Sequence, residues 1–156
     1  MLVVANQTAS SDDLLGALRR VAERQPTRFT LIVPASPRQG APELLEEALR
    51  LYREAGLEAD GQLGDGDPCV AVTEAYDARR HDEIIVCTLP LGSSKWLHAG
   101  LPERIAKLTD AQVTHVVAHQ RPEAPHVVPA PAHHESLGPL LAPYTALGHR
   151  EPRTQP

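Results

Sequence analysis

Residues 84–87 read Ile-Ile-Val-Cys, and this apolar run decides the fold class of the chain. Four consecutive apolar residues are typical of a strand that is buried on both faces, as the central strands of parallel sheets are. Further strands are predicted at 2–5, 29–33 and 113–118, and the segment 57–63 alternates apolar with polar residues. The sequence therefore predicts five strands, of which the one at 57–63 is exposed on one face.

Helical patterns separate these strands. Apolar residues recur at helical spacing over 14–22 and over 44–55. A third helix is predicted over 67–77, where Asp67 and Pro68 suit the N-cap and the first helical position. A fourth helix begins near Pro102 and carries Leu101, Ile105 and Leu108. Because strand and helix alternate four times before a closing strand, we predict a three-layer α/β sandwich with a five-stranded parallel sheet.

Composition excludes several classes of protein. The chain has 156 residues, 42% of them hydrophobic, and a formal net charge of -5. This apolar content is too high for a wholly disordered chain, and the acidity argues against a general nucleic-acid binder. No apolar run approaches the roughly 18–20 residues of a transmembrane helix, and no secretory signal is recognisable, so we expect a cytoplasmic protein. Two cysteines, Cys69 and Cys87, cannot form a disulfide framework.

Proline divides the chain into two parts. Eight of its 15 prolines and five of its eight histidines fall in 119–156. We therefore predict an α/β domain over 1–118 and a separate Pro/His-rich tail over 119–156. The tail contains an apolar cluster at 137–147, which either docks on the body or on a second copy, or is an incidental feature of a flexible tail.

Familiar enzyme motifs are absent from the sequence. It has no Walker A loop, no dinucleotide glycine fingerprint, no Gly-x-Ser-x-Gly and no Cys-x-x-Cys. In open parallel sheets, however, ligands bind beyond the carboxyl ends of the strands. That rule directs attention to the loops 6–11 and 88–100. The second loop contains Gly92-Ser93-Ser94-Lys95, which suits either an anion site or a solvated turn at Gly92.

The order and spacing of several short segments resemble the universal stress protein family over residues 1–118. These segments are Asn6 at the end of the first strand, 64–68, 82–86, 101–105 and 113–117. The resemblance implies the adenine nucleotide alpha hydrolase-like sheet order 3-2-1-4-5, with a switch point between the first and fourth strands. It also implies a homodimer formed through the fifth strand.

Some members of that family bind ATP, and the resemblance implies a candidate site here. The nucleotide motif departs from the family pattern: Asn6 replaces an aspartate, Thr88 replaces a glycine, and Ala99-Gly100 lacks the closing hydroxyl. By the resemblance, Asn6 would contact the ribose and the backbone of Val33 the adenine. The predicted phosphate contacts are Gly92, Ser93, Ser94, Lys95 and Gly100.

Three other kinds of residue have two interpretations each. Cys87 is either a redox-sensitive thiol or a small core residue, and Trp96 either stacks on a ligand or anchors its loop. His115 and His119 suggest a metal, but strand positions four apart lie about 13 Å apart, too far for one ion. We therefore predict no metal site and no catalytic residue.

The leading hypothesis is a regulatory or protective, non-catalytic protein that binds ATP or another adenine nucleotide weakly at the switch point. One alternative is an ATP-hydrolysing or nucleotide-transferring enzyme, which would need a general base. The other is a ligand-free, dimeric, partner-binding module.

Overall fold

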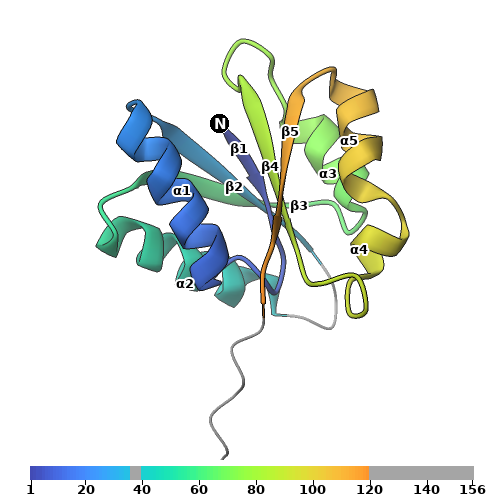
Figure 1. Ribbon diagram of the computed structural model, residues 1–156, viewed down its shortest axis with the longest axis horizontal. Helices are drawn as coiled ribbons and strands as arrows, with labels where there is room; N and C mark the ends of the chain where they lie inside the picture. The colour runs from blue at the N-terminus through green and yellow to red at the C-terminus, as the bar shows by residue number, and fades with distance from the viewer. Residues whose placement is uncertain (36–39, 120–156) are drawn as a thin grey trace, which may run out of the picture. The chain divides into compact units, whose positions relative to one another are not determined.

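A computed structural model describes residues 1–35 and 40–119 of the chain, and in these ranges it contains a five-stranded parallel sheet (Figure 1). The strand order is β3-β2-β1-β4-β5, and each neighbouring pair is parallel. This confirms the predicted three-layer fold and sheet order. The strands are β1 (Leu2–Val4), β2 (Arg28–Pro34), β3 (Glu58–Gly64), β4 (Glu83–Thr88) and β5 (Gln112–Val117). The helices are α1 (Asp12–Arg24), α2 (Ala41–Glu54), α3 (Pro68–Ala75), α4 (Lys95–His98) and α5 (Leu101–Thr109).

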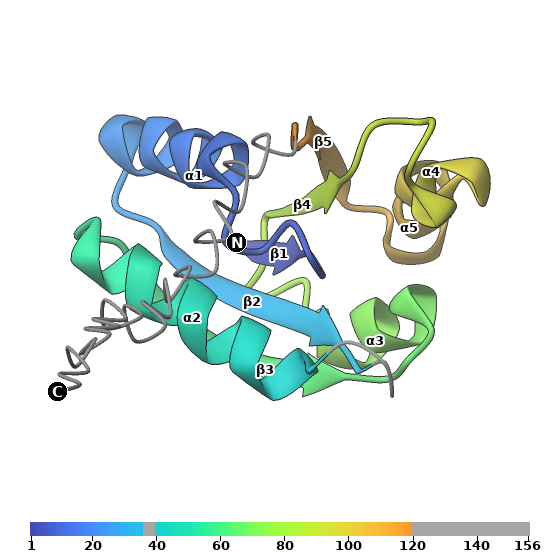
Figure 2. The same cartoon turned by 90° about the horizontal axis from the view of Figure 1, so that it is seen from below.

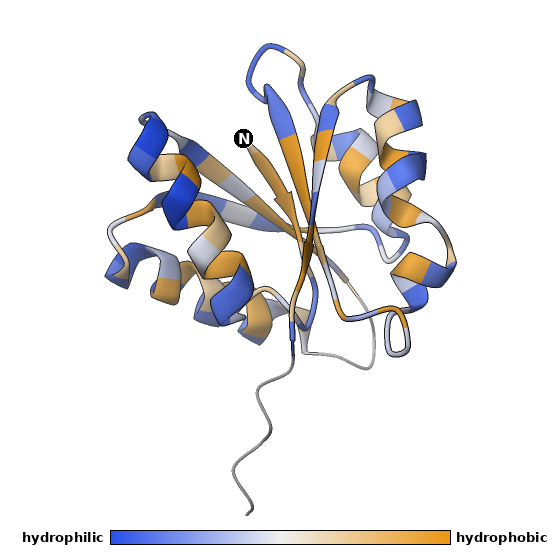
Figure 3. Cartoon of the chain, in the orientation of Figure 1, coloured by the Kyte–Doolittle hydropathy of each residue, from blue (hydrophilic) through white to orange (hydrophobic). Residues whose placement is uncertain are grey.

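Helices cover both faces of the sheet. Figure 2 shows α1 and α2 on one side and α3, α4 and α5 on the other. Successive residues of β1 serve opposite faces, since Val3 belongs to the core under α1 and α2 whereas Leu2 and Val4 belong to the core under α3 and α5. All three are fully buried. Figure 3 accordingly shows apolar residues along the central strands and on the inner faces of the helices.

The central strands explain why the run at 84–87 decides the fold. β1 pairs with β2 on one side and with β4 on the other, so Val3 stands between Leu31 and Ile85. A strand with a neighbour on each side and a helix layer on each face has no exposed surface. Continuous apolar sequence follows from that position.

Side chains cap the N-termini of α1 and α3, as predicted for Asp67. The Ser11 hydroxyl accepts a hydrogen bond from the N–H of Leu14 (3.3 Å) at the start of α1. The Asp67 carboxylate accepts one from the N–H of Cys69 (2.8 Å) at the start of α3. Each bond satisfies a backbone donor that has no partner inside the helix.

The described structure differs from the sequence prediction in three places. The loop predicted over 88–100 contains the short helix α4, whose single turn is too short to show an apolar period. The third helix ends at Ala75 rather than near 77. Leu108, predicted for the buried stripe of the fourth helix, is 57% exposed. The other two residues predicted for this stripe, Leu101 and Ile105, are buried, and so is Pro102.

No helix in the described ranges is long and apolar enough to cross a membrane. The predictions for 119–156, including the apolar cluster at 137–147, lie outside the described residues except for His119.

Candidate functional site

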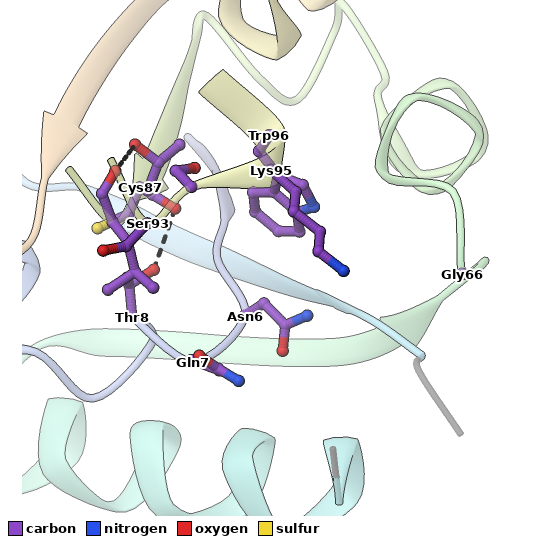
Figure 4. Close-up of a pocket in the computed structure, with 11 residues that line it drawn as sticks. Asn6, Gln7, Thr8, Gly66, Cys87, Ser93, Lys95 and Trp96 are labelled. Carbon is purple, nitrogen blue, oxygen red and sulfur yellow. Dashed lines mark hydrogen bonds between the residues drawn. The ribbon is translucent and has the colours of Figure 1, made fainter. Parts of the chain in front are cut away.

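A cavity of about 400 Å³ opens at the carboxyl ends of β1 and β4 (Figure 4). This is the point where the sheet order reverses, because β1 leads through α1 to β2 on one side while β4 lies on the other. The described residues that line the cavity are Asn6, Gln7, Thr8, Gly66, Cys87, Thr88, Leu89, Ser93, Ser94, Lys95 and Trp96.

The loop after β1 is fixed by two buried hydrogen bonds. The Thr8 hydroxyl donates to the backbone carbonyl of Cys87 (3.0 Å), which ties this loop to the end of β4. The Tyr52 hydroxyl, from α2, donates to the carbonyl of Ala9 (2.6 Å). Burial raises the pKa of Tyr52 well above its usual value, so the phenol stays protonated and remains a donor. Asn6 and Gln7 are therefore carried on a firmly held segment.

The loop after β4 folds back on itself before it presents Lys95 and Trp96. The N–H groups of Ser93 and Ser94 both bond to the carbonyl of Pro90, at 2.8 and 3.0 Å. The buried Ser94 hydroxyl then caps α4 by accepting from the N–H of Leu97 (3.2 Å). Figure 4 shows Lys95 and Trp96 extending from α4 towards the space that the Asn6 side chain faces.

The position of Trp96 is compatible with both roles considered from the sequence, that of a loop anchor and that of a stacking surface for a ligand. Its half-buried indole packs against the core formed under α3 and α5, as a loop anchor does. It also lines the cavity, where its ring is available for stacking.

The electrostatics of the cavity are simple. Lys95 is the one charged side chain among the described lining residues, and none of these residues is a carboxylate or an imidazole. Within the described ranges, no group of three or more His, Cys, Asp or Glu side chains could hold a metal ion. The cavity therefore offers one cation, several amide and hydroxyl groups, and one aromatic ring.

Two solved structures share this architecture. A universal stress protein in complex with cAMP matches with a TM-score of 0.54 and 21% sequence identity, covering 76% of this chain and 98% of that one. A universal stress protein family protein from Arabidopsis thaliana with AMP bound matches with a TM-score of 0.53 and 16% identity, covering 77% of this chain and 93% of that one. The chain has the universal stress protein fold. No protein-family model matches the chain, and a search of curated proteins found no match either.

Within the universal stress protein fold, the residues predicted for the site fall into two groups. Asn6, Ser93, Ser94 and Lys95 line the cavity, whereas Val33, Gly92 and Gly100 are not among its described lining residues. The assignment of all seven as ligand contacts stays a prediction.

The three residues outside the lining have structural settings of their own. The Val33 side chain is fully buried in the core under α1 and α2. Gly92 has open space where a Cβ atom would lie, so the loop has room for a side chain at that position. Gly100 is left-handed (φ 61°) at the start of α5, a conformation that favours glycine there.

Gly66 is a lining residue that was not among the predicted ligand contacts, although it belongs to the segment 64–68 that contributes to the family resemblance. A Cβ atom on Gly66 would lie 2.9 Å from the carbonyl oxygen of Ala35, so the β3–α3 turn passes close to the end of β2. Its position in the sequence could have identified it. Gly66 follows β3, so it lies at the same edge of the sheet as the loops 6–11 and 88–100.

Thr88, which the resemblance puts in place of a glycine, has a side chain with partners of its own. The hydroxyl donates to the carbonyl of Leu89 (2.9 Å) and lies 2.8 Å from His115 Nε2. The two contacts are satisfied together when Nε2 of His115 carries the hydrogen, because one hydroxyl has only one hydrogen to donate. Thr88 thereby joins the cavity floor to the edge strand β5.

Cys87 behaves as a core residue. It is fully buried, and desolvation raises the pKa of its thiol, an effect that hydrogen bonds with Thr8 and Ser11 only partly oppose. A thiol whose pKa lies above the ordinary value is protonated at neutral pH and is a poor nucleophile. The environment of Cys87 thus favours the packing interpretation over the redox one.

Proposed function

We propose that this chain is a universal-stress-like regulatory or protective protein that binds an adenine nucleotide in the cavity between the ends of β1 and β4. The observation that carries the proposal is the position of that cavity at the switch point of the sheet. Its volume lies within the roughly 300–1,000 Å³ typical of small-molecule pockets. The AMP and cAMP in the two solved structures of the same fold support the choice of ligand class.

The lining residues suit the three parts of such a ligand. The Asn6 amide can both donate to and accept from ribose hydroxyls, without the charge of a carboxylate. Lys95 supplies a cation for a phosphate, and Trp96 supplies a flat apolar surface. The backbone of Val33, at the end of β2, remains the proposed adenine contact.

A binding role is better supported than catalysis. Hydrolysis or nucleotidyl transfer needs a general base or a bound metal to activate the attacking group. The described lining residues contain no carboxylate and no imidazole, and the Cys87 thiol is protonated. We therefore propose a protein without catalysis, and the enzyme remains the second candidate.

Calorimetric titration of the full chain with AMP and with ATP tests the binding proposal. We expect saturable heat that Asn6→Ala weakens, because the amide of Asn6 would contact the ribose. Heat that is absent up to millimolar nucleotide would contradict the proposal and favour the partner-binding module. Release of inorganic phosphate from ATP, lost in the Lys95→Met chain, would favour the enzyme instead.

The proposal extends to assembly and location. We propose a cytoplasmic homodimer formed through β5, which lies at the edge of the sheet and so presents one side of its backbone for pairing.

A further inference from the structure

We infer that the cavity selects adenine nucleotides carrying a single phosphate, bound through Lys95 without a divalent metal ion, and gains nothing from the further phosphates of ATP. This inference rests on the proposed function, since it names the ligand of that same site. It is carried by the charges of the lining, by the hydrogen bonds inside the loop after β4, and by the acidic residues beside Gly66.

Charge is the first argument. Lys95 is the only charged group among the described lining residues, so one phosphate can be paired and a second or third finds no cation there. A charge-assisted hydrogen bond is roughly twice as strong as one between neutral groups. The α-phosphate can form such a bond with Lys95, whereas β- and γ-phosphates would have to rely on water.

The backbone of the loop after β4 is the second argument. Loops that cradle several phosphates do so with N–H groups that point at the ligand. Here the N–H groups of Ser93 and Ser94 bond to Pro90, that of Leu97 bonds to the Ser94 hydroxyl, and that of His98 bonds to the Ser94 carbonyl (3.2 Å). These four donors are used within the loop, so they do not point at a ligand as the N–H groups of a polyphosphate cradle do.

The opposite wall is the third argument. Gly66 lines the cavity between Asp65 and Asp67 in the chain, and both aspartates are exposed. Their carboxylates accept backbone hydrogen bonds, Asp65 from the N–H of Asp67 (2.8 Å) and Asp67 from the N–H of Cys69 (2.8 Å). Neither aspartate adds a cation to that wall, so a second or third phosphate gains no charge partner from it. A magnesium ion on ATP also finds no carboxylate among the described lining residues to complete its coordination.

The test uses the one tryptophan of the chain as a site-specific probe. Trp96 lines the cavity, so quenching of its fluorescence reports occupancy directly. The full chain is titrated with adenosine, AMP and ATP at constant ionic strength, with and without magnesium. We expect AMP to bind about tenfold more tightly than adenosine, since one charge-assisted hydrogen bond distinguishes them. ATP should bind no more tightly than AMP, and magnesium should leave both affinities unchanged.

Substitution of Lys95 then isolates its contribution. Lys95→Met should bring the affinity for AMP down to that for adenosine. Lys107, the only other lysine, lies on α5 outside the cavity lining, so Lys107→Met changes the net charge equally and should preserve the preference for AMP. Arg38 follows β2 in the sequence but lies outside the described residues. Arg38→Ala is therefore measured in parallel as a second control that removes one positive charge.

The outcomes separate the two proposals. ATP binding that is clearly tighter than AMP binding, or that requires magnesium, would overturn the single-phosphate inference and leave nucleotide binding intact. Loss of the AMP preference in Arg38→Ala or Lys107→Met would also overturn it. Failure of adenosine and AMP to bind the unsubstituted chain, by fluorescence and by calorimetry, would overturn the proposed function and this inference together.

Discussion

Tyr52 is one of the two residues whose hydroxyls hold the loop after β1 in place. Its side chain is fully buried and its hydroxyl donates to the carbonyl of Ala9, which is also buried. Tyr52→Phe removes the hydroxyl donor, so the buried carbonyl of Ala9 loses this hydrogen bond. The loss should lower the free energy of unfolding by about 1–3 kcal/mol. Chemical denaturation measures the change. Tyr76→Phe is the matched control, since Tyr76 is only half-buried at the end of α3, and equal losses in the two variants would contradict the argument.

His81 makes the stability of the fold sensitive to acid. It is only 4% exposed, and its Nδ1 accepts a hydrogen bond from the N–H of Asp77 (3.1 Å). Burial is the largest cause that lowers the pKa of His81, assisted by the N-terminal ammonium and Arg80 and opposed by Asp77 and Asp60. The unfolded chain therefore takes up this proton at a higher pH than the folded chain does, so stability falls as the pH drops below about 6.5.

His81→Asn tests this linkage, because the asparagine carbonyl can replace Nδ1 as an acceptor but does not titrate. Free energies of unfolding are compared at about pH 7.5 and about pH 5.5, on either side of the histidine range. The unsubstituted chain should lose more stability between these two pH values than His81→Asn does. His98→Asn, at an exposed position of α4, should behave like the unsubstituted chain. Parallel losses in all three chains would refute the role of His81.

Single residues also show where sequence reasoning stops. The apolar spacing of α2 places Tyr52 on the buried face, and the structure agrees. The spacing says nothing about Ala9, which lies 43 positions earlier in the chain and meets Tyr52 only through the tertiary fold. The same holds for Thr8 and the carbonyl of Cys87. Local patterns predict which residues are buried, whereas the hydrogen bonds that shape the site join loops distant in sequence.

At the scale of elements, α3 depends on Gly64 for its approach to the sheet. A Cβ atom on Gly64 would lie 2.5 Å from Cβ of Ala71 and 2.9 Å from Cγ2 of Ile32. Both neighbours are buried and cannot swing away, so Gly64→Ala should force α3 off β3 and cost about 1–3 kcal/mol of stability. Gly92→Ala is the control with open space, expected within about 0.5 kcal/mol of the unsubstituted chain. Thermal unfolding measures both effects, and Gly64→Ala should melt at a lower temperature than Gly92→Ala. Similar melting temperatures for the two variants would contradict the packing argument.

The elements predicted well are those whose sequence pattern is long. The apolar stripes of α1 and α2 each extend over more than two turns, and both helices are found. The helix α4 was missed because one turn of Lys95–His98 contains no repeat, although Ser94 at its start has the residue type of an N-cap. That omission matters for the site, since α4 is the element that presents Lys95 and Trp96 to the cavity.

At the scale of the whole molecule, the alternation of strands and helices was enough to predict the parallel sheet. Connections between parallel strands are almost always right-handed, which leaves few possible topologies. The strand order itself came from resemblance to a family, and the order observed agrees with it. The same order leaves β5 at an edge, where it has a neighbour on one side only.

The hydrogen bonding of that edge specifies a test of the proposed dimer. The N–H of Ala118 bonds to the carbonyl of Thr88 on the β4 side (2.8 Å). Because the backbone groups of successive strand residues point to opposite edges, those of His115 face away from β4. A second copy pairing there would need the N–H of His115, which His115→Pro removes while leaving the ladder to β4 in place.

Sedimentation velocity should therefore find the unsubstituted chain as a dimer and His115→Pro as a folded monomer. His115→Ala separates the backbone from the imidazole, since it loses the contact with Thr88 but keeps the N–H, and it should remain a dimer. Circular dichroism of His115→Pro checks that loss of the dimer is not loss of the fold. A monomeric unsubstituted chain, or a His115→Pro chain that still dimerises, would place any self-association on a surface other than the open side of β5.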